Sequence, residues 1–254
     1  MPELPEVETV VRQLHSKIAG KKVVSVESFD DKVIDPKLVT LPPFTITSVT
    51  RRGKLIIIET NKGHLLVHLR MTGHFNGDKY CKGIFHFEDG MRLTHHSIRR
   101  FGGITLYSKE ELGEKLSVLG SEPLEISSSN FASILSKYPN ANIKNKLLDQ
   151  TCVVGIGNIY AMEALYHAGI DPRCKISEVS TKKLSTLHQE TRRILLLSIV
   201  NNGATVDNYS NLDGRGDFQN LLAVYGKDTC PKGHSLIKIK QGGRGTWYCG
   251  NCQE

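Results

Sequence analysis

The chain has 254 residues, of which 39% are hydrophobic and 23% are charged, so it can bury a core and is not a disordered protein. Its length argues for two compact domains, because single domains usually hold about 100–200 residues. It carries 33 Lys and Arg against 26 Asp and Glu, a net charge of +7, which suggests a polyanionic partner such as nucleic acid. No apolar run approaches the roughly 20 residues of a membrane span, and the acidic start MPELPEVETV excludes a secretory signal. We therefore expect a cytoplasmic protein with no membrane partner and with reduced cysteines.

The first predicted element is a helix over residues 5–19. Its apolar residues repeat with the spacing of one helical face: Val7, Val10, Val11, Leu14 and Ile18. Pro5 suits the first turn, Glu6 and Glu8 favour the positive end of the helix dipole, and Gly20 suits the C-terminal end. The amino terminus is therefore expected to be held by the fold.

Residues 22–106 predict a mostly antiparallel sheet, as a sandwich or a barrel. Residues 54–60 and 64–71 are rich in Leu, Ile and Val, with a short turn between them. Residues 84–88 and 91–95 flank Asp89-Gly90, which is a strong hairpin signal.

From about residue 125 the periodicity becomes helical, over residues 130–138, 142–150, 158–168 and 180–201. Residues 127–129 are three serines that resemble a linker, and residues 153–158 predict a tight turn between two helices. The predicted organisation is an α+β fold with an N-terminal sheet domain, a helical domain and a C-terminal strand-and-turn segment, over residues 1–125, 130–226 and 227–254.

Positive charge is concentrated in two stretches. Residues 51–101 and 227–254 both carry an excess of Lys and Arg, whereas residues 102–141 are net acidic. The two basic stretches are either solvated faces or surfaces that bind phosphate groups.

The C-terminal segment contains Cys230, His234, Cys249 and Cys252. The Cys-x2-Cys pair at a turn and the Cys-x3-His pair predict four ligands for one tetrahedral Zn²⁺ in a closed structural site. Alternatively, His234 is a surface residue beside a three-ligand site. Trp247 lies between the ligand pairs, where it either contacts nucleic acid or packs the finger. The other three cysteines are interpreted as ordinary thiols.

The amino terminus has a chemical interpretation of its own. Loss of Met1 would expose the secondary amine of Pro2, and an α-amino group titrates at about 8, so a useful fraction is a neutral nucleophile at pH 7. Such an amine can attack an aldehydic carbon, with Glu3 and Glu6 moving protons. The alternative is that these acids only stabilise the start of a helix.

Motifs along the whole chain resemble the formamidopyrimidine-DNA glycosylase (Fpg/Nei) family. The start MPELPEVET resembles the start of that family, and residues 51–54 resemble its strand lysine. Residues 68–73 and 98–102 resemble its two intercalation loops. Residues 144–149 and 153–161 resemble its helix-two-turns-helix motif, and the tail resembles its zinc finger.

The resemblance implies an N-terminal β-sandwich with a leading helix and a helical C-terminal domain that ends in a zinc-finger β-hairpin. It implies a DNA glycosylase and AP lyase of base excision repair that acts as a monomer on damaged duplex DNA. In a bacterium, such a protein would be associated with the nucleoid. The damaged nucleotide is flipped out of the duplex, and Pro2 forms a Schiff base with its sugar. Glu3 protonates the sugar oxygen, Glu6 is a supporting acid, and β,δ-elimination cuts the strand.

The resemblance also assigns DNA contacts. Met71, Arg99 and Phe101 would fill the gap that the flipped base leaves, although without the resemblance Met71 and Phe101 would be core residues. The residues that match the family's phosphate contacts are Lys54, His68, Lys144, Asn158, Tyr225 and Arg244. Lys54 and Arg244 also belong to the catalytic set. Asn158 could instead be a plain helix cap and His68 a strand histidine. Arg215 is our candidate for contact with the flipped base.

Three features depart from the family pattern. His234 with x3 spacing stands where a cysteine with x2 spacing is usual, Arg70 stands where a glycine is usual, and Ile98 stands where a proline often follows an aspartate. Leu4 and the three intercalating residues resemble the branch that removes oxidised purines, namely 8-oxoguanine and formamidopyrimidines. The alternatives are an oxidised-pyrimidine glycosylase and a non-catalytic DNA-binding zinc protein on the same scaffold.

Overall fold

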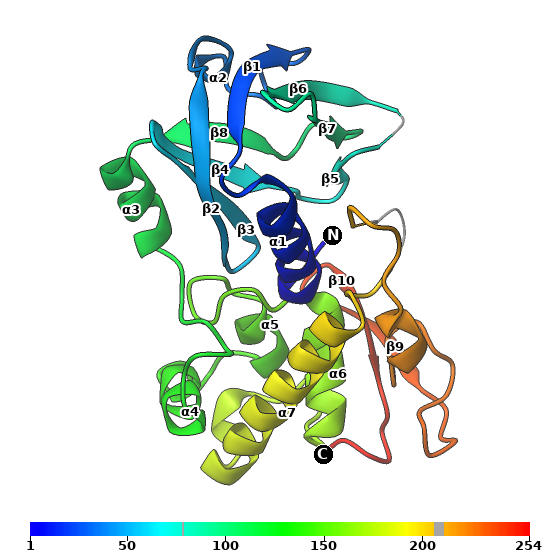
Figure 1. Cartoon of the computed structure of the whole chain (residues 1–254). Helices are drawn as coiled ribbons and strands as arrows, with labels where there is room; N and C mark the ends of the chain where they lie inside the picture. The colour runs from blue at the N-terminus through cyan, green and yellow to red at the C-terminus, as the bar shows by residue number, and fades with distance from the viewer. Residues whose placement is uncertain (78, 206–210) are drawn as a thin grey trace. The chain divides into compact units, whose positions relative to one another are not determined.

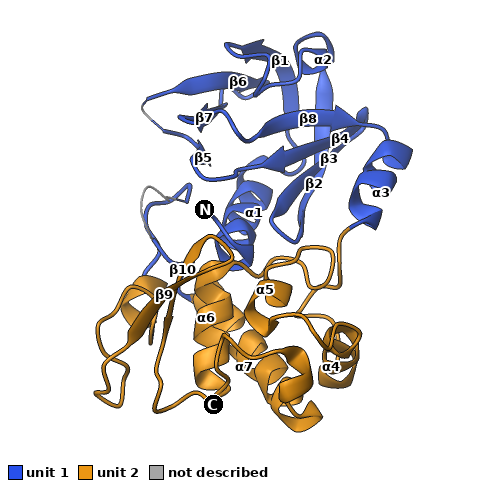
Figure 2. Ribbon diagram, turned by 180° about the vertical axis from the view of Figure 1, so that it is seen from behind, with its two compact units in different colours: residues 1–118, 201–217 blue, residues 119–200, 218–254 orange. Residues whose placement is uncertain are grey.

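The computed structural model describes residues 1–77, 79–205 and 211–254 (Figure 1). The chain divides into two compact units (Figure 2). Unit 1 comprises Met1–Val118 and Asn201–Asp217, and unit 2 comprises Leu119–Val200 and Phe218–Glu254. Within the described residues, no helix is both long and apolar enough to cross a membrane.

Unit 1 contains three helices and eight strands within its described part. In chain order these are α1 (Leu4–Ile18), β1 (Lys22–Ser28), α2 (Lys37–Thr40), β2 (Phe44–Arg52), β3 (Leu55–Thr60), β4 (Gly63–His68), β5 (Gly73–Phe75), β6 (Cys81–Phe87), β7 (Arg92–Ser97), β8 (Gly103–Tyr107) and α3 (Lys109–Ser117). The predicted leading helix and the hairpin around Asp89-Gly90 are therefore confirmed.

The eight strands are antiparallel and follow the order β5-β7-β6-β1-β2-β3-β4-β8. The two halves of this order join where β1 pairs with β2 over only two positions, Lys22↔Thr45 and Val23↔Phe44. Buried residues of both halves share one apolar core, with Val23 and Phe85 on one side and Ile56 and Val67 on the other. The sheet therefore folds over on itself as a sandwich, which confirms the predicted N-terminal architecture.

Helix α1 forms where the sequence predicts it and packs against β2 and β3. Its apolar face is buried, while Arg12, Lys17 and other polar residues lie on the opposite face. Glu3 is the N-cap residue and forms a capping box with Glu6, so the first turn begins directly after Pro2.

Two segments from late in the sequence complete unit 1. Residues 201–205 and 211–217 are tied to each other, since Asp217 N donates to Asn201 O over 3.0 Å and Gly216 N donates to Thr205 Oγ1 over 2.8 Å. They are also tied to α1, because Gln13 accepts from Leu212 N and donates to Asn211 Oδ1. No local sequence pattern predicted this return to the first helix.

Unit 2 is helical and ends in a hairpin. Its elements are α4 (Ser128–Ser136), α5 (Ile143–Leu147), α6 (Asn158–His167), the 3-10 turn η1 (Ile176–Glu178), α7 (Thr181–Val200), the 3-10 turn η2 (Phe218–Leu221), β9 (Ile237–Gln241) and β10 (Arg244–Tyr248). Helix α7 packs against α4 and α6, and β10 packs against α6. The predicted helices and the C-terminal hairpin are confirmed.

One local prediction was wrong, and one helix was not predicted. The serines that resembled a linker begin helix α4, because Ser127 Oγ accepts from Asn130 N over 3.2 Å as an N-cap. Helix α3 was not expected, although the capping box of Ser108 and Glu111 at its start could have revealed it.

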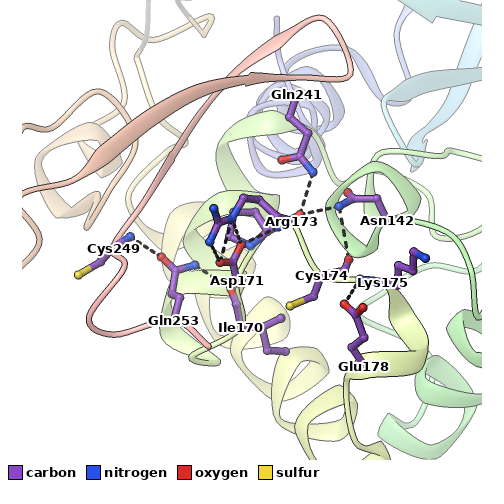
Figure 3. A network of polar contacts seen from close by, with 11 residues as sticks. Asn142, Ile170, Asp171, Arg173, Cys174, Lys175, Glu178, Gln241, Cys249 and Gln253 are labelled. Carbon is purple, nitrogen blue, oxygen red and sulfur yellow. Dashed lines mark hydrogen bonds and ion pairs between the residues drawn. The ribbon is translucent and has the colours of Figure 1, made fainter.

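A network of polar contacts joins the hairpin to the helices of unit 2 (Figure 3). The Pro172 carbonyl accepts from Asn142 Nδ2 and from Gln241 Nε2, both over 2.8 Å. Gln253 Nε2 donates to Ile170 O over 2.8 Å, and Gln253 Oε1 accepts from Cys249 N over 2.8 Å. Asn142 also caps α5, so one network fixes both the hairpin and the start of that helix.

Candidate functional site

The predicted catalytic residues at the amino terminus are buried. Pro2, Glu3 and Glu6 all lie inside unit 1, whereas Met1 is exposed. Glu6 Oε2 accepts from Glu3 N over 2.8 Å, and Glu6 Oε1 accepts from Ala204 N over 2.8 Å. Glu6 therefore fixes the backbone at Glu3 and also holds the late segment around Ala204 against the helix start.

The close packing at Glu6 requires a glycine on the facing segment. Gly203 has φ +81°, and an added Cβ there would lie 3.0 Å from Glu6 Cγ and 3.1 Å from Glu6 Oε1. A side chain at this position would meet both a strained backbone and the buried carboxylate. This contact was not predicted, although the pair Asn202-Gly203 marks a turn in the sequence.

Lys54 lies in the turn between β2 and β3, and most of its surface is buried. The strand before this turn is tied to α1 through Arg51, whose Nε donates to Glu8 Oε2 over 2.9 Å and whose guanidinium also donates to Gly53 O. Burial raises the pKa of Glu8, but hydrogen bonds from Arg12 and Arg51 outweigh it and leave the pKa below its usual value. The ionised Glu8 thus holds the Lys54 turn to the helix that carries Glu3.

His68 ends β4 and is held in its neutral form. Burial, followed by the charges of Arg70 and Lys54, lowers its pKa to about 4. Its Nδ1 accepts from Arg70 N over 3.0 Å, which leaves Nε2 as the N–H donor. His68 can therefore donate a hydrogen bond to a phosphate but brings no positive charge at pH 7.

The two predicted intercalation loops lie next to each other in unit 1. Arg99 Nη1 donates to Met71 Sδ over 3.2 Å, and Arg99 N donates to Thr72 Oγ1 over 3.1 Å. Met71 is 44% exposed and Phe101 is 68% exposed, so neither residue belongs to the core. Large apolar groups held at the surface by a folded loop indicate a contact with another molecule.

Each loop contains an arginine in the left-handed backbone region. Arg70 has φ 52° and precedes Met71, whereas Arg100 has φ 56° and separates Arg99 from Phe101. This conformation costs a non-glycine residue about 1–2 kcal/mol. Arg70 stands where the family usually has a glycine, which is the residue that adopts this conformation most easily.

Arg215 is exposed in unit 1, on the segment that α1 holds through Gln13. The structure does not bring it into contact with Pro2 or Glu3 through any described hydrogen bond. Its role remains a prediction.

In unit 2, Lys144 and Asn158 form one cluster with the hairpin. Lys144 is 0% exposed, and its Nζ donates to Asn158 Oδ1 over 2.8 Å. Asn158 Nδ2 in turn donates to Gly245 O on β10 over 3.0 Å. Asn158 is also the first residue of α6, where backbone N–H groups point outward toward any anion.

The tight turn before α6 is organised by one side chain. Gln150 donates to Leu148 O and Ile156 O, both over 2.9 Å, and its Oε1 accepts from Gly155 N over 2.9 Å. The turn thereby places Lys144 of α5 against Asn158 of α6. The sequence predicted the turn but not the residue that shapes it.

Arg244 begins β10 directly after the hairpin turn and is exposed. The turn is Gly242-Gly243, with φ 55° and 76°, between the paired residues Gln241 and Arg244. Two successive positive φ values match the tight turn that suits the twist of a hairpin and favours glycine. Arg244 thus lies at the tip of a rigid finger.

The four predicted metal ligands converge at the base of this finger. His234 Nδ1 lies 3.7 Å from Cys230 Sγ, 3.6 Å from Cys249 Sγ and 3.4 Å from Cys252 Sγ. All four ligand atoms lie within 4.8 Å of one another. A tetrahedral zinc with bonds of about 2.3 Å to sulfur and 2.0 Å to nitrogen would separate sulfur from nitrogen by about 3.5 Å. The donor set therefore fits a zinc ion, with His234 among the ligands.

Two models of the same protein family match this chain. The model of the formamidopyrimidine-DNA glycosylase N-terminal domain matches residues 1–104, and that of the formamidopyrimidine-DNA glycosylase H2TH domain matches residues 119–210. The chain belongs to the formamidopyrimidine-DNA glycosylase family. The resemblance inferred from the motifs is therefore confirmed.

Relatives within the family match over the full length. The formamidopyrimidine-DNA glycosylase of Bacillus subtilis is 40% identical, covering 100% of this chain and 99% of the relative. That of an Exiguobacterium species is 37% identical and covers 100% of both chains. Among solved structures, Lactococcus lactis Fpg in complex with DNA that contains Fapy-dG has a TM-score of 0.92 at 34% identity over 100% of both chains.

The sequence patterns did not reveal one buried acid, Glu163 on α6. It is buried, and its carboxylate accepts from the backbone N–H groups of Ala223, Val224 and Tyr225 over 2.7, 3.0 and 2.9 Å. Burial raises its pKa, and these three hydrogen bonds oppose the rise. An acid within an otherwise apolar helical stretch was the signal that could have found it.

Glu163 fixes the backbone of Tyr225, which was predicted to contact DNA. The Tyr225 ring lies 5.2 Å from the Trp247 ring, and Trp247 N donates to Met162 Sδ. Of the two interpretations of Trp247, packing of the finger is therefore the one that the structure supports. Lys238 Nζ lies over the Trp247 ring at 4.8 Å, which leaves a cation beside this cluster.

Proposed function

We propose that this chain is a bifunctional DNA glycosylase and AP lyase of base excision repair that removes oxidised purines from damaged duplex DNA. The observation that carries the proposal is the N-terminal cluster, where a capping box holds Pro2 and Glu3 at the positive end of α1. Membership of the formamidopyrimidine-DNA glycosylase family supports it. So does the similarity to Lactococcus lactis Fpg bound to Fapy-dG DNA and to abasic-site DNA.

The chemistry begins with the secondary amine of Pro2, once Met1 is removed. The amine forms a bond to C1′ of the flipped nucleotide, the C1′–N bond to the base breaks, and the base leaves with a proton. Glu3 gives a proton to the ring oxygen, the sugar ring opens, and an iminium ion joins Pro2 to C1′. The iminium acidifies C2′, and loss of that proton expels the 3′ phosphate, with a second elimination on the 5′ side. Glu6, which fixes the backbone of Glu3, supports this geometry.

The phosphate contacts divide between the two units. Lys54 and neutral His68 serve in unit 1, and Lys144, Asn158, Tyr225 and Arg244 serve in unit 2. Contacts of this kind set register on the duplex and make affinity depend on salt. We assign Lys54 and Arg244 to the phosphates next to the reacting sugar.

We assign one structural zinc ion to Cys230, His234, Cys249 and Cys252. The tetrahedral fit of the ligand atoms describes a closed site, and among the described residues the cluster contains these four ligands and no fifth one. The metal contributes folding free energy to a hairpin that is too small to build a core of its own.

The purine preference rests on Leu4 and on the set Met71, Arg99 and Phe101. These three side chains suit the gap that a flipped base leaves, since a guanidinium can bond the orphaned partner base and a ring can wedge a base step. We also propose that the protein acts as a monomer in the cytoplasm and, in a bacterium, at the nucleoid.

The deciding experiment is borohydride trapping on duplex DNA with 8-oxoguanine opposite cytosine, read out by intact mass. We expect a covalent adduct at Pro2 and a free protein without Met1. An adduct only with oxidised pyrimidines would replace the purine assignment by the alternative glycosylase. No adduct with 8-oxoguanine, oxidised-pyrimidine or abasic DNA would overturn the enzyme in favour of the non-catalytic binder.

A single variant tests the role of Glu3 in base excision. Glu3→Gln should lose base excision by more than tenfold while it retains more cleavage at preformed abasic sites, because only the first reaction needs departure of a base. Equal losses in both assays would contradict the role given to Glu3.

A further inference from the structure

Asp30, which lies beyond the sequence motifs, is joined to the second intercalation loop. Arg100 Nε lies 2.5 Å from Asp30 Oδ2, and Arg100 Nη2 donates to Asp30 Oδ1 over 2.9 Å. The guanidinium therefore grips the carboxylate with two nitrogens, which is the strongest and most directional form of this ion pair. The Asp30 side chain is only 7% exposed, whereas the Arg100 side chain is 47% exposed, so the carboxylate is shielded while the guanidinium still meets solvent.

Asp30 is itself fixed by the sandwich. Its carbonyl accepts from Val33 N and Ile34 N, both over 2.9 Å, and its Oδ1 accepts from Lys32 N over 3.2 Å. Lys82 on β6 lies 3.5 Å from Oδ2. The carboxylate is thus a rigid anchor and not a mobile surface acid.

The anchor acts at the strained point of the loop. Arg100 adopts a left-handed backbone and stands between Arg99 and Phe101, which we assigned to the gap that the flipped base leaves. A single left-handed residue gives the backbone a different course from that of an extended or right-handed one, so the conformation of Arg100 determines where its two neighbours point. A non-glycine residue keeps this conformation only where its surroundings hold it, and here the Asp30 fork does so.

We propose that Asp30 is a positioning residue that holds Arg100 in its left-handed conformation and so presents Arg99 and Phe101 to the DNA. The inference rests on the proposed function, because it assigns Asp30 to the insertion step of that reaction. The pairing also has a second effect, since it neutralises Arg100 and keeps this cation from binding phosphates indiscriminately.

Loss of the fork should therefore change two quantities in opposite directions. Asp30→Asn should lower single-turnover excision of 8-oxoguanine about tenfold, because the inserting side chains are no longer held. The same variant should bind undamaged duplex more tightly and with a steeper salt dependence, by up to about one unit of slope, because Arg100 becomes available to a phosphate. A variant that was only less well folded would lose both properties.

The test compares the loss of excision caused by Asp30→Asn in proteins with and without the Phe101 ring. In the Phe101→Ala background, Asp30→Asn should reduce excision by less than twofold further, since Asp30 acts through the loop. The same tenfold loss in both backgrounds would overturn the proposal. Asp31→Asn is the matched control, because Asp31 is exposed and bonds Ser28 Oγ instead of the loop, and it should leave excision unchanged.

Arg100→Gln approaches the same pair from the exposed side and keeps the test decisive if Asp30→Asn fails to fold. It should match the excision loss of Asp30→Asn, and the double variant should lose no more than either single one. Borohydride trapping at a preformed abasic site should stay within about threefold of the unmodified protein in every variant. Absence of that adduct in the unmodified protein would contradict the proposed function, whereas normal trapping without the coupling would contradict only the role of Asp30.

Discussion

Lys144 in unit 2 and Phe101 in unit 1 are both assigned to DNA contact, yet they are held in opposite ways. Lys144 is 0% exposed and bonds Asn158, which in turn bonds the backbone of β10. Phe101 is 68% exposed, on a loop fixed at its base by Thr72 and Asp30. One residue is built into a network, and the other projects from an anchored support.

The difference follows from what each residue must reach. A phosphate group arrives at the protein surface with a fixed shape, so donors arranged in advance bind it without further ordering. A side chain that replaces a flipped base must leave the protein and enter the duplex, and it cannot be packed on all sides beforehand. Substitutions in the first group should therefore change stability and affinity together, whereas substitutions in the second should change activity alone.

The largest effect should come from the metal ligands, which support the network in unit 2. Structural zinc contributes about 10–16 kcal/mol to the folding of zinc-finger peptides, so its removal should unfold the hairpin that carries Arg244 and Gly245. We expect Cys249→Ser to lose the metal and at least tenfold in duplex affinity, measured by native mass spectrometry and fluorescence anisotropy. The strands of unit 1 should keep their amide-exchange protection.

His234 separates a four-ligand site from a three-ligand site. His234→Cys should keep the metal, because the thiolate replaces one donor by another, and His234→Ala should lose it. Retention of metal and full affinity by His234→Ala would show that His234 is not a ligand.

The second effect tests the buried lysine. Asn158→Ala removes the acceptor of the Lys144 ammonium and should cost about 2 kcal/mol of unfolding free energy, the range of a hydrogen bond to a charged group. Asn158→Asp is the matched variant, since it keeps an acceptor for Lys144 but places a negative charge where the phosphate should lie. Like Asn158→Ala it loses the donor to Gly245 O, but because it keeps the acceptor for Lys144 it should be more stable than Asn158→Ala in urea unfolding and still lose duplex affinity. If Asn158→Asp binds DNA normally, Asn158 is a plain helix residue.

The third effect is a dependence on pH from two histidines of unit 1. Burial is the main cause that lowers the pKa of His68 to about 4 and that of His95 to about 3. In the unfolded chain both titrate at about 6.5, so between pH 6.5 and 4 the unfolded state binds more protons and stability falls with acidity. Because each histidine takes up a proton in the unfolded chain, each should lower the unfolding free energy by about 2 kcal/mol as the pH falls from 7 to 5.

Substitution of either histidine should weaken the dependence of the unfolding free energy on pH. His95 is fully buried, and neither ring nitrogen has a hydrogen-bond partner within the described part of the chain, so His95→Leu should lose most of its share without opening a cavity. His68→Gln should flatten the profile similarly while it keeps a neutral donor for the phosphate. A profile that stays equally steep in both variants would assign the acid sensitivity to other groups.

The smallest effect on stability should come from the exposed loop. Phe101→Ala should change the unfolding free energy by no more than about 0.5 kcal/mol, as expected at an exposed site. Excision of 8-oxoguanine should nevertheless fall about tenfold or more, because the gap in the duplex is left unfilled. Phe85→Ala is the opposite control, since this buried ring should cost about 3–5 kcal/mol. A Phe101→Ala variant that loses stability instead of activity would place the ring in the core.

Local sequence patterns revealed most of the elements and most of the candidate site. The spacing of Val7, Val10 and Leu14 specified α1, and two short Cys/His pairs predicted the zinc ligands, because each of these signals lies within a few residues of the chain. The assignments of Lys144 and Asn158 came instead from the resemblance to the family. The interpretation failed at the three serines, which begin α4, since a capping serine and a linker serine are alike until the following helix is counted.

Contacts between distant segments could not be found in this way. Glu6 meets Ala204, Glu163 meets Tyr225, and Asp30 meets Arg100, each across a separation that no periodicity spans. In each pair a carboxylate holds a functional segment in place, and its partner is a backbone N–H or an arginine whose sequence neighbourhood carries no signal.

The sequence by itself determined the basic charge and the order of motifs of one family, and it predicted two domains, a nucleophilic amino terminus and a zinc-binding tail. Those properties depend on residue type and short spacing, which are visible in one dimension. Only the tertiary structure decided that residues 201–205 and 211–217 return to α1, that His234 meets the three cysteines, and that two left-handed arginines lie in the exposed loops. Burial and backbone strain arise when remote segments pack, and their energies depend on neighbours that the linear order does not specify.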